Sequence, residues 1–303
     1  MSGPAERPAP ARSWAYSTNG LTRRPLLEAI SCIAEAGYQG VELLADAPHW
    51  TPHAETDMTW RGHERSCSPT ELKRALSDHG LWVSNINANT AMLCWPRWMP
   101  ETIFEPALSH PDRQVRSRRV DLAYRAMDWA SELGAPRVSV TSGRCPGGCP
   151  PEEGIRYFAD SLALLCDRAT ELDLELSVEY EPGLLIERWS ELRALLDRVD
   201  HPRLGANLDL GHARCAGEDP VEAIQGLAGK IWSVHVEDIL AHKHYHLIPG
   251  EGDLDLQAAL NALDDVHYTG PLTVELYTYS DAPLEGDLDA LRRAHRYLTQ
   301  RLT

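Results

Sequence analysis

Leu174-Glu175-Leu176-Ser177-Val178-Glu179 is a short, largely apolar segment that ends on an acidic side chain. Three later segments repeat the pattern, 203–209, 231–235 and 271–275, and they end on Asp209, His235 and Glu275. Apolar segments of this length are typical of strands that a parallel sheet buries on both faces. Because the carboxyl ends of parallel strands meet at one edge, we expect the four terminal side chains to lie together at the mouth of a barrel.

The alternation of strand and helix runs through the whole chain. Strands are predicted over 14–19, 40–44, 81–87, 137–141, 174–179, 203–209, 231–235 and 271–275. Helices are predicted over 24–36, 69–79, 113–133, 152–172, 190–199, 220–227, 254–265 and 288–302, with Ser190 as the N-cap of the fifth. Eight strand–helix units, with the long irregular segments after the strands, predict an α/β fold of the (β/α)8 TIM-barrel type.

A doubly wound parallel sheet is the alternative architecture, and it would carry a glycine-rich turn after its first strand. Asn19-Gly20-Leu21 is not such a turn, so the barrel is favoured. We expect a single domain over residues 13–303, preceded by a disordered lead-in, 1–12, that is rich in proline and alanine. The lead-in has no apolar core and does not resemble a secretory signal.

Composition restricts the class of protein. Of the 303 residues, 43% are hydrophobic and 24% are charged, which is ordinary for a soluble globular chain. The net charge of -16 argues against a nucleic-acid partner, because phosphate neutralisation needs a basic surface. No apolar run reaches the roughly 18 residues that a membrane span needs. The seven cysteines are scattered and odd in number, which favours reduced thiols and a cytoplasmic protein.

The four strand-end residues offer three carboxylates and one imidazole, which is a suitable donor set for one divalent metal. Such an oxygen-rich set suits Mn²⁺, which is our first expectation, with Mg²⁺, Co²⁺ and Zn²⁺ as alternatives. The other interpretation is that Glu179, Asp209 and Glu275 only cap helix N-termini, where carboxylates are common.

Six segments carry a resemblance to a known family. They are Ala36-Gly37-Tyr38-Gln39-Gly40-Val41-Glu42-Leu43, Ser177-Val178-Glu179, Leu208-Asp209-Leu210-Gly211-His212, Val234-His235-Val236-Glu237-Asp238, Pro249-Gly250-Glu251-Gly252 and Tyr268-Thr269-Gly270-Pro271-Leu272-Thr273-Val274-Glu275. With these segments the chain, from about Trp14 to Leu302, resembles the xylose isomerase-like TIM-barrel superfamily, in particular its sugar isomerase/epimerase branch.

The resemblance implies roles for individual residues. The positions that match Glu179, Asp209, His235 and Glu275 hold one divalent metal in that branch. Glu179 and Glu275 would also transfer protons on opposite faces of the substrate carbon, and His212 would contact substrate oxygens. No second set of ligands, such as a two-metal hydride-shift isomerase needs, is visible in the sequence.

Further candidates for substrate binding are His246, Glu42, Asn87 and Glu181. His246 precedes the turn at 249–252 that the family places beside its pocket, and Glu42, Asn85 and Asn87 follow strands on the other half of the barrel. The ketohexose 3-epimerases of the branch carry a second Glu six residues after the first ligand. This chain has Leu185 there and Glu181 at two residues, which puts a free ketohexose in doubt as the substrate.

Weaker signals surround these candidates. The tract that holds His242, His244 and His246 either binds a metal or is solvated. Glu237 or Asp238 is a candidate for orienting a metal ligand.

Two groups in the loops have open roles. Cys145 and Cys149 could form a thiol pair or a zinc site. The tryptophans of the two long loops either cover the pocket as a lid or pack the loops onto the barrel, and they are Trp50, Trp60, Trp95 and Trp98.

The expected function is that of a metal-dependent isomerase or epimerase. Its partner would be a small polyhydroxylated keto substrate, namely a sugar, sugar acid or cyclitol, that reacts through an enediolate. A dehydratase of the inosose or 3-dehydroshikimate type on the same barrel is the alternative. An apurinic endonuclease would need more ligands and a basic groove, and a non-catalytic binding barrel would not need the ligands at all. A homo-oligomer is compatible with the sequence.

Overall fold

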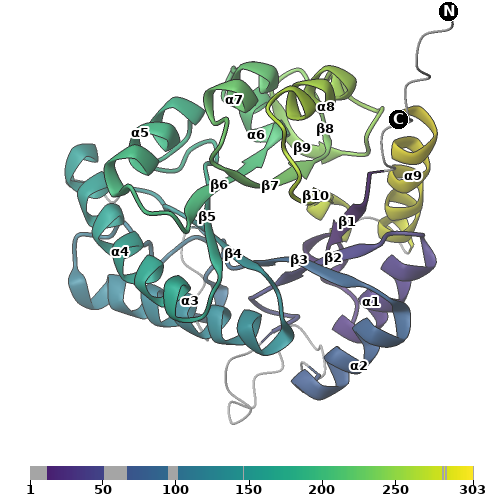
Figure 1. The fold of residues 1–303 in the computed structure, drawn as a ribbon, viewed down its shortest axis with the longest axis horizontal. Helices are drawn as coiled ribbons and strands as arrows, with labels where there is room; N and C mark the ends of the chain where they lie inside the picture. Colours follow the sequence, from purple (N-terminus) through teal and green to yellow (C-terminus); the bar gives the residue numbers. More distant parts are fainter. Residues whose placement is uncertain are drawn as a thin grey trace, which may run out of the picture.

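Eight parallel strands form a closed barrel, as the sequence predicts (Figure 1). The computed structural model describes residues 12–50, 67–94, 102–145, 147–281, 283 and 285–302. The barrel strands are β1 (Trp14–Ser17), β2 (Gly40–Leu44), β3 (Trp82–Asn87), β4 (Arg137–Thr141), β5 (Glu175–Glu179), β6 (Leu204–Asp209), β7 (Ile231–Val236) and β10 (Leu272–Val274). Around the barrel their order is β1-β10-β7-β6-β5-β4-β3-β2. This arrangement confirms the (β/α)8 TIM barrel.

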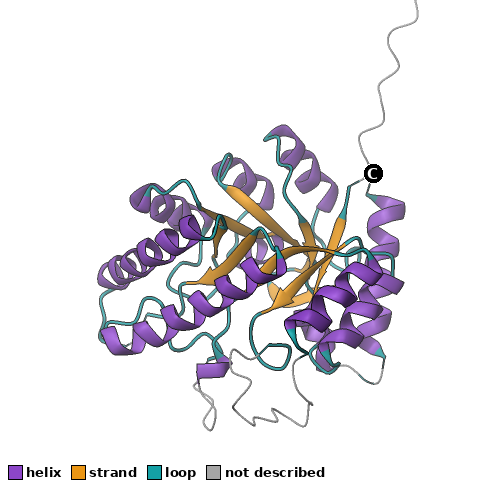
Figure 2. Ribbon diagram, turned by 60° about the horizontal axis from the view of Figure 1, so that its bottom comes forward, coloured by secondary structure: helices purple, strands orange, loops and turns teal. Residues whose placement is uncertain are grey.

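Helices enclose the strands on the outside (Figure 2). They are α1 (Leu26–Glu35), α2 (Pro69–His79), α3 (Arg113–Leu133), α4 (Pro151–Glu171), α5 (Trp189–Val199), α7 (Pro220–Gly226), α8 (Leu256–Asp265) and α9 (Gly286–Arg301). Each lies within a few residues of its predicted range. Apolar side chains such as Leu43, Val140 and Leu208 are fully buried in the core between the strands and these helices.

Local sequence signals define the ends of several helices. Ser68 and Glu71 form a capping box at the start of α2, and Gly80 ends that helix in the left-handed conformation. The predicted N-cap at Ser190 is wrong, because α5 begins one residue earlier, at Trp189. The backbone N–H of Trp189 donates to Glu218 at 3.2 Å, so a carboxylate from another segment satisfies this helix end.

Two elements depart from the simple alternation. A short helix, α6 (Leu210–Cys215), follows β6 directly. The sequence predicts an irregular segment after each strand. The one after β7 instead contains β8 (Asp238–Leu240), which pairs antiparallel with β9 (Lys243–Leu247). This hairpin packs against α6 (Figure 1).

Part of the predicted chain lies outside the described residues. This applies to positions 1–11 of the lead-in, whereas Arg12 is described and forms an ion pair of 2.5 Å with Asp264. It also applies to Trp60, Trp95 and Trp98 of the loops. The fourth loop tryptophan, Trp50, is buried and stacks on Trp129 with ring centroids 5.5 Å apart, so this one packs the loop onto the barrel.

Short 3-10 helices complete the described chain: η1 (Thr18–Leu21), η3 (Met92–Cys94) and η4 (Tyr277–Asp281). Among the described helices, each is either too short or too polar to cross a membrane.

Candidate metal centre

The four predicted ligands converge at the carboxyl ends of neighbouring strands. Glu179 ends β5, Asp209 ends β6, His235 lies near the end of β7, and Glu275 directly follows β10. All four side chains are buried, and one ligand atom from each lies within 4.8 Å of the other three. Strand register explains the convergence, because Asp209 pairs with His235 and the neighbouring Asn207 pairs with Glu179. We call these four residues the ligand quartet.

The quartet has the spacing of ligands around a single cation. His235 Nδ1 lies 3.5 Å from Glu179 Oε2, 3.7 Å from Asp209 Oδ2 and 3.6 Å from Glu275 Oε2. Two donor atoms that are each about 2.1 Å from one metal lie roughly 3 to 3.8 Å apart. Asp209 Oδ2 and His235 Nδ1 are buried, and among the residues that the structure describes they have no hydrogen-bond partner. Unsatisfied buried polar atoms are costly, so these residues fit a divalent metal.

The far side of His235 is held by Glu42. His235 Nε2–H donates to Glu42 Oε2 at 2.8 Å, and Glu42 also accepts from Ser17 at 2.9 Å, Asn85 at 2.8 Å and Asn87 at 3.0 Å. A carboxylate in this position selects the tautomer that leaves Nδ1 free, as in many metal-binding histidines. Glu42 and Asn87 were expected to bind substrate hydroxyl groups. Among the described residues, Glu42 contacts His235 of the quartet and Asn87 contacts Glu275 of the quartet, and contact with substrate stays a prediction for both.

Negatively charged side chains dominate the electrostatics of the quartet. Burial would lower the pKa of His235, but attraction to Glu42, Glu179 and Glu275 raises it well above 6.5. Burial disfavours the charged form of Asp209, yet nearby imidazoles, His212 foremost, hold the pKa of this carboxyl well below 3.8. The quartet therefore favours positive charge at its centre, whether a proton on His235 or a metal cation.

Glu179 is oriented by two amide groups. Its Oε2 accepts from Asn89 Nδ2 at 2.7 Å and from Asn207 Nδ2. Its Oε1 lies 3.5 Å from His212 Nδ1. The amides hold the carboxylate in a defined direction within the buried site.

Glu275 accepts hydrogen bonds from side chains of the other half of the barrel. Its Oε1 accepts from Asn19 at 3.2 Å, from Asn87 at 3.3 Å and from Ser17 at 3.4 Å. Burial raises the pKa of Glu275 to about 8, and although His235 opposes this rise, repulsion from Glu179 reinforces it. A carboxyl group with this pKa can exchange a proton near neutral pH.

The helix-cap interpretation applies to one oxygen of one residue. Asp209 Oδ1 accepts from the His212 N–H at 2.7 Å and so caps α6, while Oδ2 faces the quartet. A single carboxylate therefore begins a helix and offers a metal ligand, so the two interpretations are compatible at Asp209.

His212 and His246 both border the quartet. His212 Nδ1–H donates to the Tyr180 carbonyl at 2.9 Å, and His246 Nδ1–H donates to the Glu275 carbonyl at 2.9 Å. Of the two alternatives for the histidine tract, solvation fits His242, which is exposed, whereas His246, a candidate site residue, is fully buried. The reason is the β8–β9 hairpin, which directs alternate side chains of β9 towards the barrel.

Burial also suppresses the charge of these imidazoles. It lowers the pKa of His244 to about 4 and the pKa of His246 to about 3, and in both cases His212 contributes to the shift. Both rings are accordingly neutral near neutral pH.

Three acidic residues lie around the quartet. Glu181 is half-buried, and burial together with repulsion from Glu179 raises its pKa well above 4.5. Glu237 is fully buried, and its Oε1 accepts from the Gly211 N–H. Asp238 accepts from the backbone N–H groups of Ile239, Gly250 and Leu254 and thereby organises the turn at 249–252. Glu237 and Asp238 both shape the backbone beside the ligands.

Cys145 and Cys149 lie apart from these clusters. Cys145 S–H donates to the Cys149 carbonyl at 3.2 Å. Among the described residues, neither cysteine belongs to a group of three that could hold a metal.

Sequence reasoning missed the amides that hold the acids, above all Asn89 and Asn207. A signal for them was present, because Asn85, Asn87 and Asn89 alternate along β3 and beyond it, and Asn207 precedes Asp209 by two residues. Residues two apart in a strand point to the same face, so each amide shares a face with a residue of the site.

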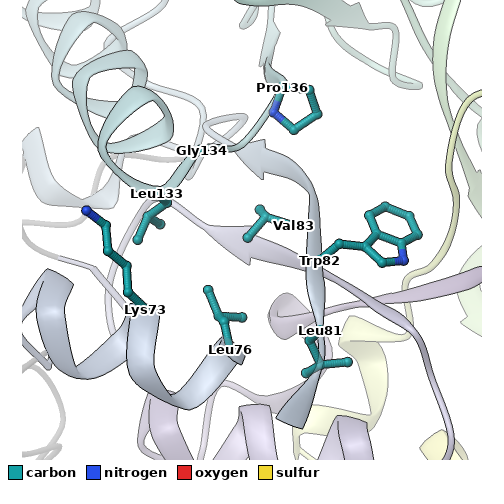
Figure 3. Close-up of a pocket in the computed structure, with 8 residues that line it drawn as sticks. All are labelled: Lys73, Leu76, Leu81, Trp82, Val83, Leu133, Gly134 and Pro136. Atoms are coloured by element: carbon teal, nitrogen blue, oxygen red, sulfur yellow. The ribbon is translucent and has the colours of Figure 1, made fainter. Parts of the chain in front are cut away.

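A separate pocket of about 480 Å³ lies at the other end of the barrel (Figure 3). Its lining comes from the amino end of β3 and from the ends of α2 and α3, and it includes Leu76, Trp82 and Leu133. Because the quartet lies at the carboxyl ends of the strands, this pocket is not part of the candidate metal centre.

Taken together, these features define a TIM barrel with a buried carboxylate–imidazole centre at the carboxyl ends of strands β5, β6, β7 and β10. The chain belongs to the xylose isomerase-like TIM barrel family, whose family model matches residues 30–300.

Individual relatives include sugar epimerases and related enzymes. The chain is 26% identical over 289 residues to fructoselysine 3-epimerase of Escherichia coli O157:H7, which covers 93% of this chain and 97% of that protein. It is 26% identical to 3-dehydroshikimate dehydratase of Pseudomonas putida, over 83% of this chain but only 36% of that longer protein. A solved structure of the IOLI protein with a bound zinc atom superposes with a TM-score of 0.73 at 17% identity, over 96% of this chain and 99% of that one.

Proposed function

We propose that this protein is a divalent-metal-dependent isomerase or epimerase of a sugar, sugar acid or cyclitol keto compound, acting through an enediolate. The observation that carries the proposal is the quartet, in which one imidazole nitrogen faces three buried carboxylate oxygens at 3.5 to 3.7 Å. The relationship to fructoselysine 3-epimerase over nearly the full length of both chains supports it.

The quartet would hold one metal ion, with Mn²⁺ as the first expectation and Mg²⁺, Co²⁺ or Zn²⁺ as alternatives. Zinc stays among them because a protein of the same fold has been solved with a zinc atom. When bound, such a cation would supply Lewis-acid polarisation of a ketone and its neighbouring hydroxyl group.

Glu179 and Glu275 are our candidates for the proton-transfer groups. They come from β5 and β10, which are the outer two of the four strands that carry the quartet, so they flank its centre from opposite sides. One carboxylate removes the proton from the carbon next to the carbonyl group, and the electron pair of that C–H bond forms the enediolate. The other delivers a proton to the opposite face of the same carbon, which gives an epimer, or to the former carbonyl carbon, which gives an isomer once the proton of the neighbouring hydroxyl group has passed to the other oxygen. Exchange with solvent then restores both groups.

Several neighbours would position the substrate and the acids. We assign contacts with substrate oxygens to His212, His246 and Glu181, which border the quartet. Glu42 and Asn87 would act on the substrate only indirectly, because they orient His235 and Glu275. All seven cysteines are free thiols, and we propose a reducing compartment, the cytoplasm, as the place of the reaction.

Incorporation of deuterium tests this proposal. The protein is incubated with Mn²⁺ in D₂O and a panel of keto sugars, sugar acids and cyclitols, and the recovered compounds are examined by NMR. We expect solvent deuterium at the carbon next to the carbonyl group of at least one compound. Absence of exchange across the panel, together with purified protein that binds no divalent metal, would leave a non-catalytic binding barrel as the better account.

Dehydration is the second candidate, because the chain is also related to a 3-dehydroshikimate dehydratase. A dehydratase would remove the same proton, from the carbon next to the carbonyl group. A hydroxyl group on the carbon beyond it would then leave as water. Mass spectrometry separates the two reactions, because a dehydratase product is lighter by one water and an epimerase product has the mass of its substrate.

A further inference from the structure

Arg119 is a charged side chain that lies between a helix and the barrel. It belongs to α3, which packs against β3 and β4, and its guanidinium group is almost completely buried. Burial lowers the pKa of Arg119, while the nearby Cys94 and Asp46 oppose that shift. A buried charge destabilises a fold unless hydrogen bonds and opposite charges compensate for it. The hydrogen bonds that Arg119 donates are therefore informative.

The guanidinium group of Arg119 holds the backbone directly after β3. Its Nη2 donates to the carbonyl oxygens of Ala88 and Asn89, the latter at 3.1 Å. Thr141 Oγ1, at the end of β4, donates to the same Asn89 carbonyl at 3.0 Å. Nη1 of Arg119 is buried and has no partner among the described residues. Two donors from different elements thus fix the backbone of Asn89.

The same stretch of chain carries two of the amides that hold the ligand quartet. Asn87 Nδ2 donates to Glu275 Oε1 at 3.3 Å, and Asn89 Nδ2 donates to Glu179 Oε2 at 2.7 Å. The two asparagines are also joined to each other, because the Asn89 N–H donates to Asn87 Oδ1 at 3.2 Å. A shift of the Asn89 backbone would therefore move its amide away from Glu179.

A second buried charge holds the chain beyond Asn89. Asp46 accepts from Thr90 Oγ1 at 2.5 Å and from the Met92 N–H at 2.7 Å. The chain after β3 is thus held in two places, by a cation at its start and by an anion further on. Because the contacts of Asp46 lie beyond Asn89, the position of Asn89 itself depends on Arg119 and on the strand ends.

We propose that Arg119 is a positioning residue for the ligand quartet, because it fixes the Asn89 backbone so that the Asn89 amide holds Glu179 in place. Its effect passes from the guanidinium group to the Asn89 carbonyl, and from the Asn89 amide to the Glu179 carboxylate. The proposal rests on the function proposed above, since it takes Glu179 as a metal ligand and proton-transfer group.

The size of the expected effect follows from this route. Replacing a residue that orients a metal ligand typically lowers metal affinity by about 10- to 100-fold. Arg119 acts through Asn89, and Asn207 also donates to Glu179, so part of the orientation survives without Arg119. We therefore expect a loss at the lower end of that range, about 10-fold.

The affinity of the folded protein for Mn²⁺ tests this role. Electron paramagnetic resonance of free Mn²⁺ gives the dissociation constant, and urea unfolding of the metal-free protein is measured alongside. We expect Arg119→Met to bind Mn²⁺ about 10-fold more weakly than the wild type. Arg119→Lys should lie between the two, because an ammonium group keeps the charge but lacks the planar fork of donors. Arg118→Met, at the exposed neighbouring position on α3, is the matched control and should keep the wild-type affinity.

A double-mutant cycle shows whether the effect passes through Asn89. Asn89→Ala removes the amide from Glu179, so adding Arg119→Met to it should weaken Mn²⁺ binding no further. Losses that simply add would overturn the proposed route. A folded Arg119→Met protein with the wild-type Mn²⁺ affinity and a shifted urea midpoint would show that Arg119 serves only the stability of the fold.

Two further outcomes complete the test. If Arg119→Met does not fold, Arg119→Lys decides, and wild-type Mn²⁺ affinity in that variant would overturn the proposal. A wild-type protein that binds no Mn²⁺ would instead contradict the proposed metal-bound quartet, and with it the role of Arg119. Failure of the Arg119 variants alone leaves the proposed isomerase or epimerase intact, because the quartet of the wild type still binds Mn²⁺.

Discussion

The imidazole of His235 is bonded to the carboxylate of Glu42 through Nε2, at 2.8 Å, while its Nδ1 faces the three carboxylates of the quartet. Glu42 is fully buried and comes from β2, which β1 and β10 separate from β7 in the strand order. This imidazole of the quartet is thus oriented from across the barrel interior.

Replacing Glu42 should weaken metal binding without unfolding the protein. In Glu42→Gln the side chain can still accept from His235 but no longer carries charge, so we expect about a 10- to 100-fold loss of affinity. Competition with a fluorescent chelator measures it. Glu132→Gln, at an exposed position on α3, is the control and should bind as the wild type does.

Glu275→Gln should abolish proton exchange while the barrel persists. A positioned acid–base group typically contributes about 10²- to 10⁴-fold to rate, so deuterium incorporation should fall by at least about 100-fold. Far-UV circular dichroism checks the fold. A variant with the wild-type exchange rate would remove Glu275 from the mechanism.

Removing the metal should lower thermal stability. A ligand present at about 100 times its dissociation constant stabilises the native state by about 2.7 kcal/mol. For a chain of this length that amounts to a shift of about 4 °C in melting temperature. Differential scanning calorimetry with excess Mn²⁺ and with excess chelator measures the difference. Identical melting temperatures would contradict a metal bound by the native quartet.

Acidification should destabilise the fold through His295, which lies on α9. This half-buried ring lies edge-on to Tyr38 with ring centroids 4.8 Å apart, and burial lowers the pKa of His295 below 6.5. The unfolded chain therefore binds the proton more readily than the native one. The contribution of His295 to stability is present above pH 6.5 and is lost as the pH falls towards the lower, folded-state pKa.

The variant His295→Phe isolates that contribution. Phenylalanine keeps a ring against Tyr38 but cannot titrate, so its free energy of unfolding should decline less between pH 7 and pH 5 than that of the wild type. Urea unfolding at several pH values measures both slopes. Parallel slopes would show that His295 is not the group responsible.

Gly211→Ala should distort the site through one added methyl group. A Cβ at this position would lie 2.2 Å from Glu237 Oε1, and the same glycine donates its N–H to that oxygen. Overpacking of this kind costs about 1–3 kcal/mol, and we expect weaker metal binding as well. Gly147→Ala is the matched control, because a Cβ there meets none of the described atoms within 4 Å. Equal stability of the two variants would refute the steric argument.

Much of this molecule could be predicted from local pattern. Apolar segments of strand length and segments of helical periodicity alternate eight times, and they determine the barrel because each depends on near neighbours in the chain. The position of the quartet follows from the same logic, since a residue at the carboxyl end of any parallel strand must reach the same rim.

Closure of the barrel determined the long-range contacts that these local patterns do not specify. Glu42 meets His235, and Asn87 meets Glu275, only because strands 188 or more residues apart in the chain enclose one interior. The β8–β9 hairpin folds against α6 and buries His246 next to His212, although the tract that carries it is polar. Periodicity reports which face of an element is buried, but the partner across that face depends on long-range register. The sequence alone therefore determined the barrel and the rim on which the quartet lies, and the tertiary structure decided which polar side chains hold the quartet in place.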